Sequence, residues 1–506
     1  MKSNVIILLS IFILILDCSG SNGSSTNRVI KDKNHIIAIS VNADRVENSF
    51  KNLAGGVNLV DASKEDLDRF LSKVGTNLFR IKIWTWKIKE SLNYFESADG
   101  VDYIKELKSA VDAVHNSGGK VMMQFYGMPR WLSTCDNAKC NSRLSNNIPE
   151  YSKYPPKDYT RWQELVSGMM KRLKERGVQI DYFEIYGEPN FGSTWWGNGN
   201  ISSAPSFFEH YRKTDEAIRK IFPIAKVGGA AFGSISTPLD LNSSSRYSRW
   251  IKGFIDFVKT NNIQLDFFSW HLYSPLIDIF SQDAKTIRDY LDSQGLSNVP
   301  LFLTEWGVDT GTNLRQKANT HFGASFAVAA LMEISHSVND GQTFYSLGGN
   351  LFGLITKGHQ PKASFNAFQL YSMLKGDEIM TKSDEKGYII NKKFKRKSVD
   401  FAQKDIKVVA TRDSEGISIL LTYYLPVLPR EDPNYLMSRR VNLTIDGVPF
   451  TRYIYKIYQI NNDHSNGYSG GNPDLVALED GGGEGIFQKE LDIPIYSVVL
   501  VRVTQK

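Results

Sequence analysis

The segment YFEIYGEPN, residues 182–190, leads a strand-like run directly into a carboxylate. The residues from Tyr182 to Tyr186 alternate as in a buried β-strand, and the run then ends on Gly187-Glu188-Pro189. A Glu before Pro can simply mark the place where a strand leaves a sheet for solvent. Whether Glu188 is such an exit or part of a site depends on the pattern of the surrounding chain.

The same unit, a short β-rich run followed by a stretch of helical length, repeats between residues 53 and 376. The eight runs are LAGGVNL (53–59), LFRIKIW (78–84), KVMMQFYG (120–127), YFEIYGEP (182–189), AKVGGAA (225–231), LDFFSWHLY (265–273), PLFLTEWG (300–307) and QTFYSLGG (342–349). The helical candidates include residues 64–74, 101–117, 159–176 and 315–337, and SKEDL and PKDYT are plausible helix starts. Eight such units over roughly 320 residues predict an α/β fold, a (β/α)8 barrel rather than an open sheet.

After residue 376 the pattern changes to β-rich runs separated by turn residues, which predicts an all-β sandwich. These runs are GYII (387–390), IKVVATR (406–412), GISILLTYYLP (416–426), RYIYKIYQI (452–460) and YSVVLVRVT (496–504). The segment HIIAISVN before the barrel is also strand-like, and we expect it to join the sandwich. We therefore assign residues 36–50 to a strand of the sandwich, 51–376 to the barrel and 377–506 to the sandwich itself.

The N-terminal residues predict export. Lys2 is followed by an apolar run from Val5 to Leu16, which is too short to span a bilayer but typical of a signal peptide. We assign residues 1–20 to the signal peptide and 21–35 to a flexible linker, so the mature protein is expected outside the cell or on its surface. Cys18 resembles the lipid-attachment cysteine of bacterial lipoproteins, although Asp17 stands where a small residue is expected. Free secretion and a membrane tether through Cys18 both remain open.

The remaining cysteines, Cys135 and Cys140, lie together in TCDNAKCN. An exported protein meets an oxidising environment, so we expect a disulfide that closes this small loop. Two cysteines without nearby Cys or His partners make a poor zinc site, and we expect neither a metal nor a cofactor. The formal charge of +6 is spread along the chain apart from NKKFKRKS, residues 391–398. We interpret that run as a solvated hairpin, with an acidic polysaccharide partner as the alternative, and no basic patch with interleaved aromatic residues indicates nucleic acid.

In a (β/α)8 barrel the carboxyl ends of the strands form the active face, which gives the strand-end acids a function. Glu188 ends the fourth run, and Glu305, in LFLTEWG, ends the seventh. Cleavage of a glycosidic bond needs two such carboxylates, one to protonate the leaving oxygen and one to attack the anomeric carbon or activate water. Their carboxyl groups are expected roughly 5 to 5.5 Å apart if the anomeric configuration is retained.

Other side chains near the strand ends are consistent with a sugar site. Arg80, in the second run, is placed to keep the Glu305 carboxylate ionised. His271 and Tyr273 in the sixth run share one face, which gives a hydrogen-bond donor or proton relay and a phenol for the nucleophile. Three further segments offer indole rings that could stack on sugars, and they contain Trp131, Trp306 and the pair Trp195-Trp196.

The motifs EIYGEPN, LTEWG, HLYS and GMPRWLS together resemble the retaining glycoside hydrolases of clan A. The likeness is closest to family 39, which includes β-xylosidases and α-L-iduronidases, because IYQINNDHSNGY (457–468) is similar to a His-Ser-Asn-x-Tyr segment of that family. The resemblance implies a carbohydrate substrate, with Glu188 as the acid/base and Glu305 as the nucleophile. It implies a retaining glycosidase acting on xyloside- or uronide-like substrates, and the N-terminal residues predict that this enzyme is exported. The alternatives are a silent sugar-binding barrel or a clan A enzyme of β-glucosidic or glucuronidic specificity.

One position departs from the family pattern. The family has Asn before the acid/base, where this chain has Gly187. By the resemblance, that Asn would reach the 2-hydroxyl of the sugar, a contact that strengthens in the transition state. We expect a neighbouring polar side chain to replace it, with Asn190 and Asn58 as candidates. A substrate that is substituted or deoxygenated at carbon 2 is the alternative.

Overall fold

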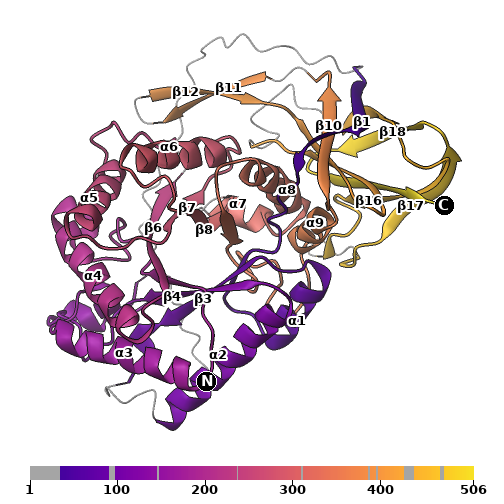
Figure 1. Cartoon of the computed structure of the whole chain (residues 1–506). Helices are drawn as coiled ribbons and strands as arrows, with labels where there is room; N and C mark the ends of the chain where they lie inside the picture. Colours follow the sequence, from indigo (N-terminus) through magenta and orange to yellow (C-terminus); the bar gives the residue numbers. More distant parts are fainter. Residues whose placement is uncertain are drawn as a thin grey trace, which may run out of the picture.

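The computed structural model describes residues 35–89, 97–144, 148–235, 238–308, 312–385, 388–394, 397–426, 438–467 and 472–506. Within these residues, parallel strands close into a barrel in chain order from β2 to β9. The strands are β2 (Val57–Leu59), β3 (Leu78–Trp84), β4 (Lys120–Tyr126), β5 (Tyr182–Ile185), β6 (Lys226–Ile235), β7 (Phe268–Tyr273), β8 (Leu301–Gly307) and β9 (Gly341–Phe344). Each of the eight predicted runs contributes one barrel strand, and the helices surround them (Figure 1).

The helices alternate with the strands as predicted. They are α1 (Lys64–Lys73), α2 (Ala98–Asn116), α3 (Tyr159–Glu175), α4 (Ala204–Ile221), α5 (Arg246–Thr260), α6 (Ile279–Ser293), α7 (Thr312–Lys317), α8 (His321–Ser335) and α9 (Ala363–Ser372). Short 3-10 helices are η1 (Thr85–Lys87), η3 (Ala138–Asn141), η4 (Glu150–Lys153), η5 (Gly197–Gly199) and η6 (Ile201–Ser203). Ser63 starts α1 with a capping box and Asp158 caps α3, because their side chains accept hydrogen bonds from the otherwise unpaired backbone N–H groups.

The helix expected over residues 315–337 is instead two helices, α7 and α8. The Thr320 side chain accepts a hydrogen bond from the Phe322 N–H and starts α8, while the buried Asn319 accepts one from the Lys362 ammonium group at 2.7 Å. These local contacts end one helix and start the next, whereas the apolar pattern alone predicts a single continuous helix. α8 is buried on nearly all sides, so its sequence is apolar throughout and lacks the alternation of apolar and polar faces. The sequence pattern therefore does not show where this helix begins.

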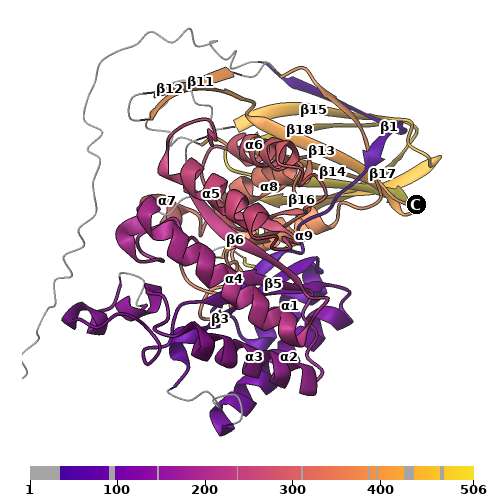
Figure 2. The same ribbon diagram turned by 60° about the vertical axis from the view of Figure 1, so that its left-hand side comes forward.

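The C-terminal residues form a second, mainly antiparallel sheet in the order β17-β16-β19-β14-β13-β10-β1-β15-β18. Its strands are β1 (Ile37–Ser49), β10 (Asp377–Ser383), β13 (Ile406–Arg412), β14 (Gly416–Tyr423), β15 (Ser438–Asp446), β16 (Arg452–Ile460), β17 (Ala477–Glu484), β18 (Phe487–Pro494) and β19 (Val498–Gln505). β1 pairs antiparallel with β10 and parallel with β15, so the segment before the barrel lies inside this sheet. β14 contacts β18, five places away in the order, and the sheet therefore curls over itself as a sandwich (Figure 2).

α8 connects the two parts, because one of its faces packs on the barrel and another on β14 and β19. The Thr422 hydroxyl donates to the Ser325 carbonyl, and the Tyr424 hydroxyl donates to the Pro275 carbonyl at 2.8 Å. The described residues of the basic run NKKFKRKS belong to two antiparallel strands, β11 (Tyr388–Phe394) and β12 (Lys397–Gln403), which form a sheet of their own. The GYII run therefore lies outside the sandwich, contrary to the prediction. Among the described residues, no helix combines the length and the apolar character needed to cross a membrane.

Candidate functional site

The candidate site lies at the carboxyl end of the barrel, above an apolar layer. The side chains of that layer fill the lower end of the barrel and are Leu78, Met122, Tyr182, Phe267 and Phe302. Because residues two apart on a strand share a face, the next inward residues on β3 and β5 are Arg80 and Glu184, and both are fully buried. Water is thus excluded from below, and the polar side chains face the open end.

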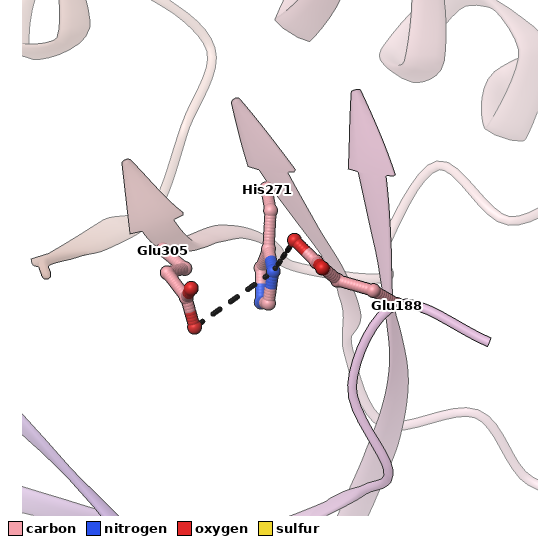
Figure 3. Close-up of side chains that lie close together, drawn as sticks. All are labelled: Glu188, His271 and Glu305. Atoms are coloured by element: carbon pink, nitrogen blue, oxygen red, sulfur yellow. Dashed lines mark hydrogen bonds and ion pairs between the residues drawn. The ribbon is translucent and has the colours of Figure 1, made fainter. Parts of the chain in front are cut away.

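The two predicted acids meet above this layer. Glu305 projects from β8, whereas β5 ends at Ile185 and Glu188 follows in a turn, where its φ is 53° and its N–H donates to the Ala231 carbonyl. One carboxylate oxygen of each acid and one ring nitrogen of His271 all lie within 4.8 Å of one another. Figure 3 shows Glu188 and Glu305 pointing toward His271 from either side. The side chains of Glu188 and Glu305 are 23% and 12% exposed, so both acids border an accessible space.

Arg80 organises the floor of the site. Its Nη1 donates to Glu305 Oε2 at 3.0 Å and to Asn58 Oδ1 at 2.8 Å. Its Nε donates to Glu184 Oε2 at 2.7 Å, and its Nη2 lies 3.3 Å from His271 Nε2. Arg80 therefore supports the acids from below and contacts the Glu305 carboxylate that it was expected to keep ionised.

His271 has a defined tautomer because guanidinium groups only donate hydrogen bonds. Arg80 must donate to Nε2, so the proton of a neutral His271 is on Nδ1, which donates to Glu188 Oε1 at 3.0 Å. Tyr273, two residues further along β7, donates its hydroxyl to Glu305 Oε1 at 2.9 Å. The alternation in HLY thus places one donor on each acid, as predicted.

Glu305 is held in its ionised form. Burial raises the pKa of its carboxyl, but the charges of His271, Lys82 and Arg80 and the Tyr273 hydrogen bond outweigh it and lower the pKa to about 2. With His271 neutral, the other three groups still favour the carboxylate. Burial and the charge of Glu305 in turn raise the pKa of Tyr273 well above its usual value, so the phenol stays a donor.

Sequence reasoning missed Lys82, which lies two residues after Arg80 on β3 and faces the same way. Its Nζ lies 3.8 Å from Glu305 Oε2. The rings of Trp84, Tyr126 and Tyr345 surround the ammonium group at 5.1, 5.0 and 5.4 Å. The alternation that identified Tyr273 from His271 would have identified Lys82 from Arg80.

Three predicted contacts with the sugar are corrected by the structure. Trp306 points away from the barrel axis and packs against Phe344 and other rings, because it follows Glu305 on the strand and so faces the helices. Asn190 is buried, and its amide exchanges two hydrogen bonds with the Gly233 backbone. Asn58 is also buried, donating to the Thr304 carbonyl and accepting from Arg80. Neither asparagine has a group that faces a sugar.

Of the other tryptophans that were expected to stack on sugars, Trp131 lies on the surface of the described structure. It borders a surface groove of about 490 Å³ together with Trp86, Arg130 and Tyr151. Trp195 is fully buried, and Trp196 donates from its indole to the Ser206 hydroxyl at 2.7 Å.

The predicted disulfide is present and lies beside that groove. Cys135 and Cys140 are bonded, with their Cα atoms 5.8 Å apart. The carbonyl of Cys135 accepts a hydrogen bond from Arg130 at 2.9 Å, so the small loop is tied to the groove wall. Cys18 and the predicted signal peptide lie outside the described residues.

The packing around position 187 explains why a glycine stands there. A Cβ atom at this position would lie 2.6 Å from Gln124 Nε2 and 3.3 Å from the Tyr126 ring. Gln124 projects inward from β4 and donates from Nε2 to the Tyr186 carbonyl at 2.7 Å. The space that a side chain at position 187 would need is therefore filled from the neighbouring strand.

The His464-Ser465-Asn466 segment connects the C-terminal sheet to the barrel helices. The Asn366 amide on α9 donates to the Ser465 carbonyl at 3.0 Å, and the Asn466 amide lies 3.4 Å from His321 Nδ1 at the start of α8.

Glu188, His271 and Glu305 have the spacing of a metal-binding triad, but the surrounding groups do not suit a cation. The His271 Nδ1 proton is donated to Glu188, and both oxygens of Glu305 already accept hydrogen bonds. The ammonium group of Lys82 lies 3.8 Å from one of those oxygens and would repel a metal ion.

Comparison with known proteins adds independent information. The model for glycosyl hydrolases family 39 matches residues 42–471. A β-xylosidase from Caldicellulosiruptor saccharolyticus is 24% identical over 399 residues, which are 71% of this chain and 76% of that protein. A β-xylosidase from Geobacillus stearothermophilus is 24% identical over 268 residues, 46% of this chain, and the match spans about half (49%) of that enzyme. The crystal structure of a monomeric β-xylosidase from Caulobacter crescentus has the same fold, with a TM-score of 0.67 at 17% identity, covering 92% of this chain and 99% of that one.

Proposed function

The chain belongs to glycosyl hydrolase family 39 and is a glycosidase that hydrolyses O-glycosyl compounds, and we propose that it does so with retention through a covalent glycosyl-enzyme. The observation that carries the proposal is the approach of the two acids, because one carboxylate oxygen of Glu188 lies within 4.8 Å of one carboxylate oxygen of Glu305. Retaining enzymes place their carboxyl groups about 5 to 5.5 Å apart, whereas inverting enzymes leave about 6.5 to 9.5 Å for a water molecule.

In the first step, Glu305 attacks the anomeric carbon while Glu188 protonates the departing glycosidic oxygen. A pKa of about 2 keeps Glu305 ionised and ready to form the bond. Arg80 and Tyr273 each hold one of its oxygens and so fix the direction of attack. His271 holds Glu188 at the opposite side of the sugar.

In the second step, water enters on the side that the leaving group vacated. Glu188, now a carboxylate, takes a proton from that water, which attacks the anomeric carbon and releases Glu305. The hydrogen bonds from Arg80 and Tyr273 stabilise the negative charge that returns to Glu305. The same two side chains therefore serve both halves of the reaction.

The relatives named β-xylosidase support xylosides as the first substrates to test, and uronide-like glycosides follow. We further propose that the protein is exported, because Lys2 and the apolar run from Val5 to Leu16 have the pattern of a signal peptide. A lipid anchor on Cys18 is the alternative to free secretion. The ordered hydrogen bonds around both acids argue against a barrel that only binds sugars.

The test uses a panel of aryl glycosides and follows product stereochemistry by NMR. The first-formed sugar should have the anomeric configuration of the substrate. In the presence of azide, Glu188→Ala should give a glycosyl azide of the same configuration, and Glu305→Ala one of opposite configuration, because azide then replaces the nucleophile. Glu175→Ala, an exposed change at the end of α3, is the matched control and should behave as the wild type. A first product of inverted configuration would overturn the proposal.

A further inference from the structure

The site lacks the side chain that Gly187 replaces, and both asparagines expected to supply it are occupied elsewhere. Lys82 is different. Its side chain is only 9% exposed, and in the described part of the chain no group lies within hydrogen-bonding distance of its ammonium group. The closest charged atom is Glu305 Oε2, at 3.8 Å. The ammonium group carries three N–H donors beside the accessible space between the two acids, so a group of the substrate can act as their acceptor.

The aromatic residues around Lys82 hold its ammonium group in place. Trp84, Tyr126 and Tyr345 all have ring centroids within 5.4 Å of Nζ. Such rings attract a cation without using its N–H groups, and they restrict the rotamers of a long, flexible side chain. The ammonium group is thereby positioned beside Glu305 before any sugar enters.

Lys82 and Gly187 both lie beside the Tyr126 ring. Ring atoms of Tyr126 lie 3.3 Å from the position of a Cβ atom at residue 187. The centroid of the same ring lies 5.0 Å from Lys82 Nζ. Gln124 fills the start of that path and prevents residue 187 from extending along it. Lys82 approaches the same region from β3.

We propose that Lys82 determines specificity at carbon 2 of the sugar that sits between Glu188 and Glu305, by donating a hydrogen bond to the oxygen there. This inference rests on the proposed function. Glu305 attacks carbon 1, so the substituent of the adjacent carbon lies next to the Glu305 carboxylate, where the Lys82 ammonium group is placed. A 2-hydroxyl can accept from Lys82 while it donates to Glu305 Oε2, and hydrogen bonds at this position strengthen in the transition state.

The charges in the site favour a neutral hydroxyl over a carboxylate or sulfate. Arg80 and Lys82 balance the buried charges of Glu184 and Glu305. An anionic substituent would add a negative charge without a partner in a mostly buried space. The sugar therefore has an ordinary 2-hydroxyl, and the alternative of a deoxy sugar is not needed.

The experiment compares kcat/KM of wild type and Lys82→Met on an aryl glycoside and on its 2-deoxy analogue. Methionine keeps the length of the side chain and removes the donor. We expect Lys82→Met to lose about 30- to 1000-fold on the parent substrate, as for other contacts made to the 2-position in the transition state, and less than about threefold on the 2-deoxy analogue. Lys285→Met, an exposed change on α6, is the control and should alter neither value.

Several results would overturn the proposal. An equal loss on both substrates would mean that Lys82 acts through the charge of Glu305, and a loss confined to carboxylated or sulfated substrates would mean that it binds an anion. If Lys82→Met does not fold by circular dichroism, Lys82→Leu, which also lacks a donor, is measured by the same criterion. A wild type that cleaves no glycoside would instead refute the proposed function itself, an outcome visible before any variant is made.

Discussion

Removal of one hydroxyl should shift the acidic limb of the pH–rate profile. Tyr273→Phe deletes the donor 2.9 Å from Glu305 Oε1 and keeps the ring. A hydrogen bond to a buried charge contributes about 1.5 to 3 kcal/mol, and one pKa unit corresponds to about 1.4 kcal/mol. The loss therefore raises the pKa of Glu305 by about one to two units, from the wild-type value of about 2. At pH 3 the wild-type nucleophile is still largely ionised, whereas the variant loses about half to nine-tenths of its carboxylate.

The assay is kcat/KM against pH from 2 to 8, with circular dichroism at each pH to show that the protein stays folded. The acidic limb of Tyr273→Phe should lie about one to two pH units above that of the wild type. Tyr371→Phe is the matched control, because it deletes a buried hydroxyl that donates to the Leu331 carbonyl away from the acids. Superimposable acidic limbs for wild type and Tyr273→Phe would refute the role given to this hydrogen bond.

Three further changes test other parts of the structure. Gly187→Asn brings a Cβ within 2.6 Å of Gln124 Nε2, so it should lower the free energy of unfolding in urea by about 1 to 3 kcal/mol; unchanged stability would mean that Gln124 moves freely. Burial raises the pKa of Asp283 from 3.8 to about 7, so the folded protein keeps a proton that the unfolded chain releases, and this contribution to stability is lost as the pH rises from about 4 to 7. Asp283→Asn should therefore be more stable than wild type by about 2 to 4 kcal/mol at pH 8 and by little at pH 4, and a difference independent of pH would contradict this. Replacing Cys135 and Cys140 by Ser opens a loop with a sequence separation of 5, which should reduce the free energy of unfolding by about 2 kcal/mol; an equal melting temperature would count against it.

The repeat of strands and helices was sufficient to predict the barrel and several of the side chains that contact Glu188 and Glu305. Alternate residues of a strand face the inside of the barrel, so His271 and Tyr273 were assigned to one face. In the structure, His271 hydrogen-bonds to Glu188 and Tyr273 to Glu305. The same rule, applied to the residue after Glu305, would have turned Trp306 toward the helices, where it lies. The prediction was wrong because it considered only that an indole ring can stack on a sugar. It did not consider that Trp306 follows an inward-facing residue on the strand and must therefore face outward.

Other features depend on contacts between strands that a single run does not contain. Gln124 pairs in register with Glu184, and this alignment brings its amide to the position next to Gly187. Asn190 lies in the turn after the strand, where the alternation of inward and outward side chains no longer predicts its direction. Its amide hydrogen-bonds to the Gly233 backbone. Register and turn geometry are set by the packed barrel, so these positions could not be derived from local pattern alone.

Trapping the glycosyl-enzyme tests the central claim most directly. Glu188→Ala removes the base for the second step, so an aryl glycoside with a good leaving group should still transfer its sugar to Glu305 and then stay bound. Intact mass of the quenched Glu188→Ala protein should rise by one glycosyl unit, and peptide mapping should place that unit on Glu305. Turnover without any mass increase, or a sugar attached to a residue other than Glu305, would contradict the account.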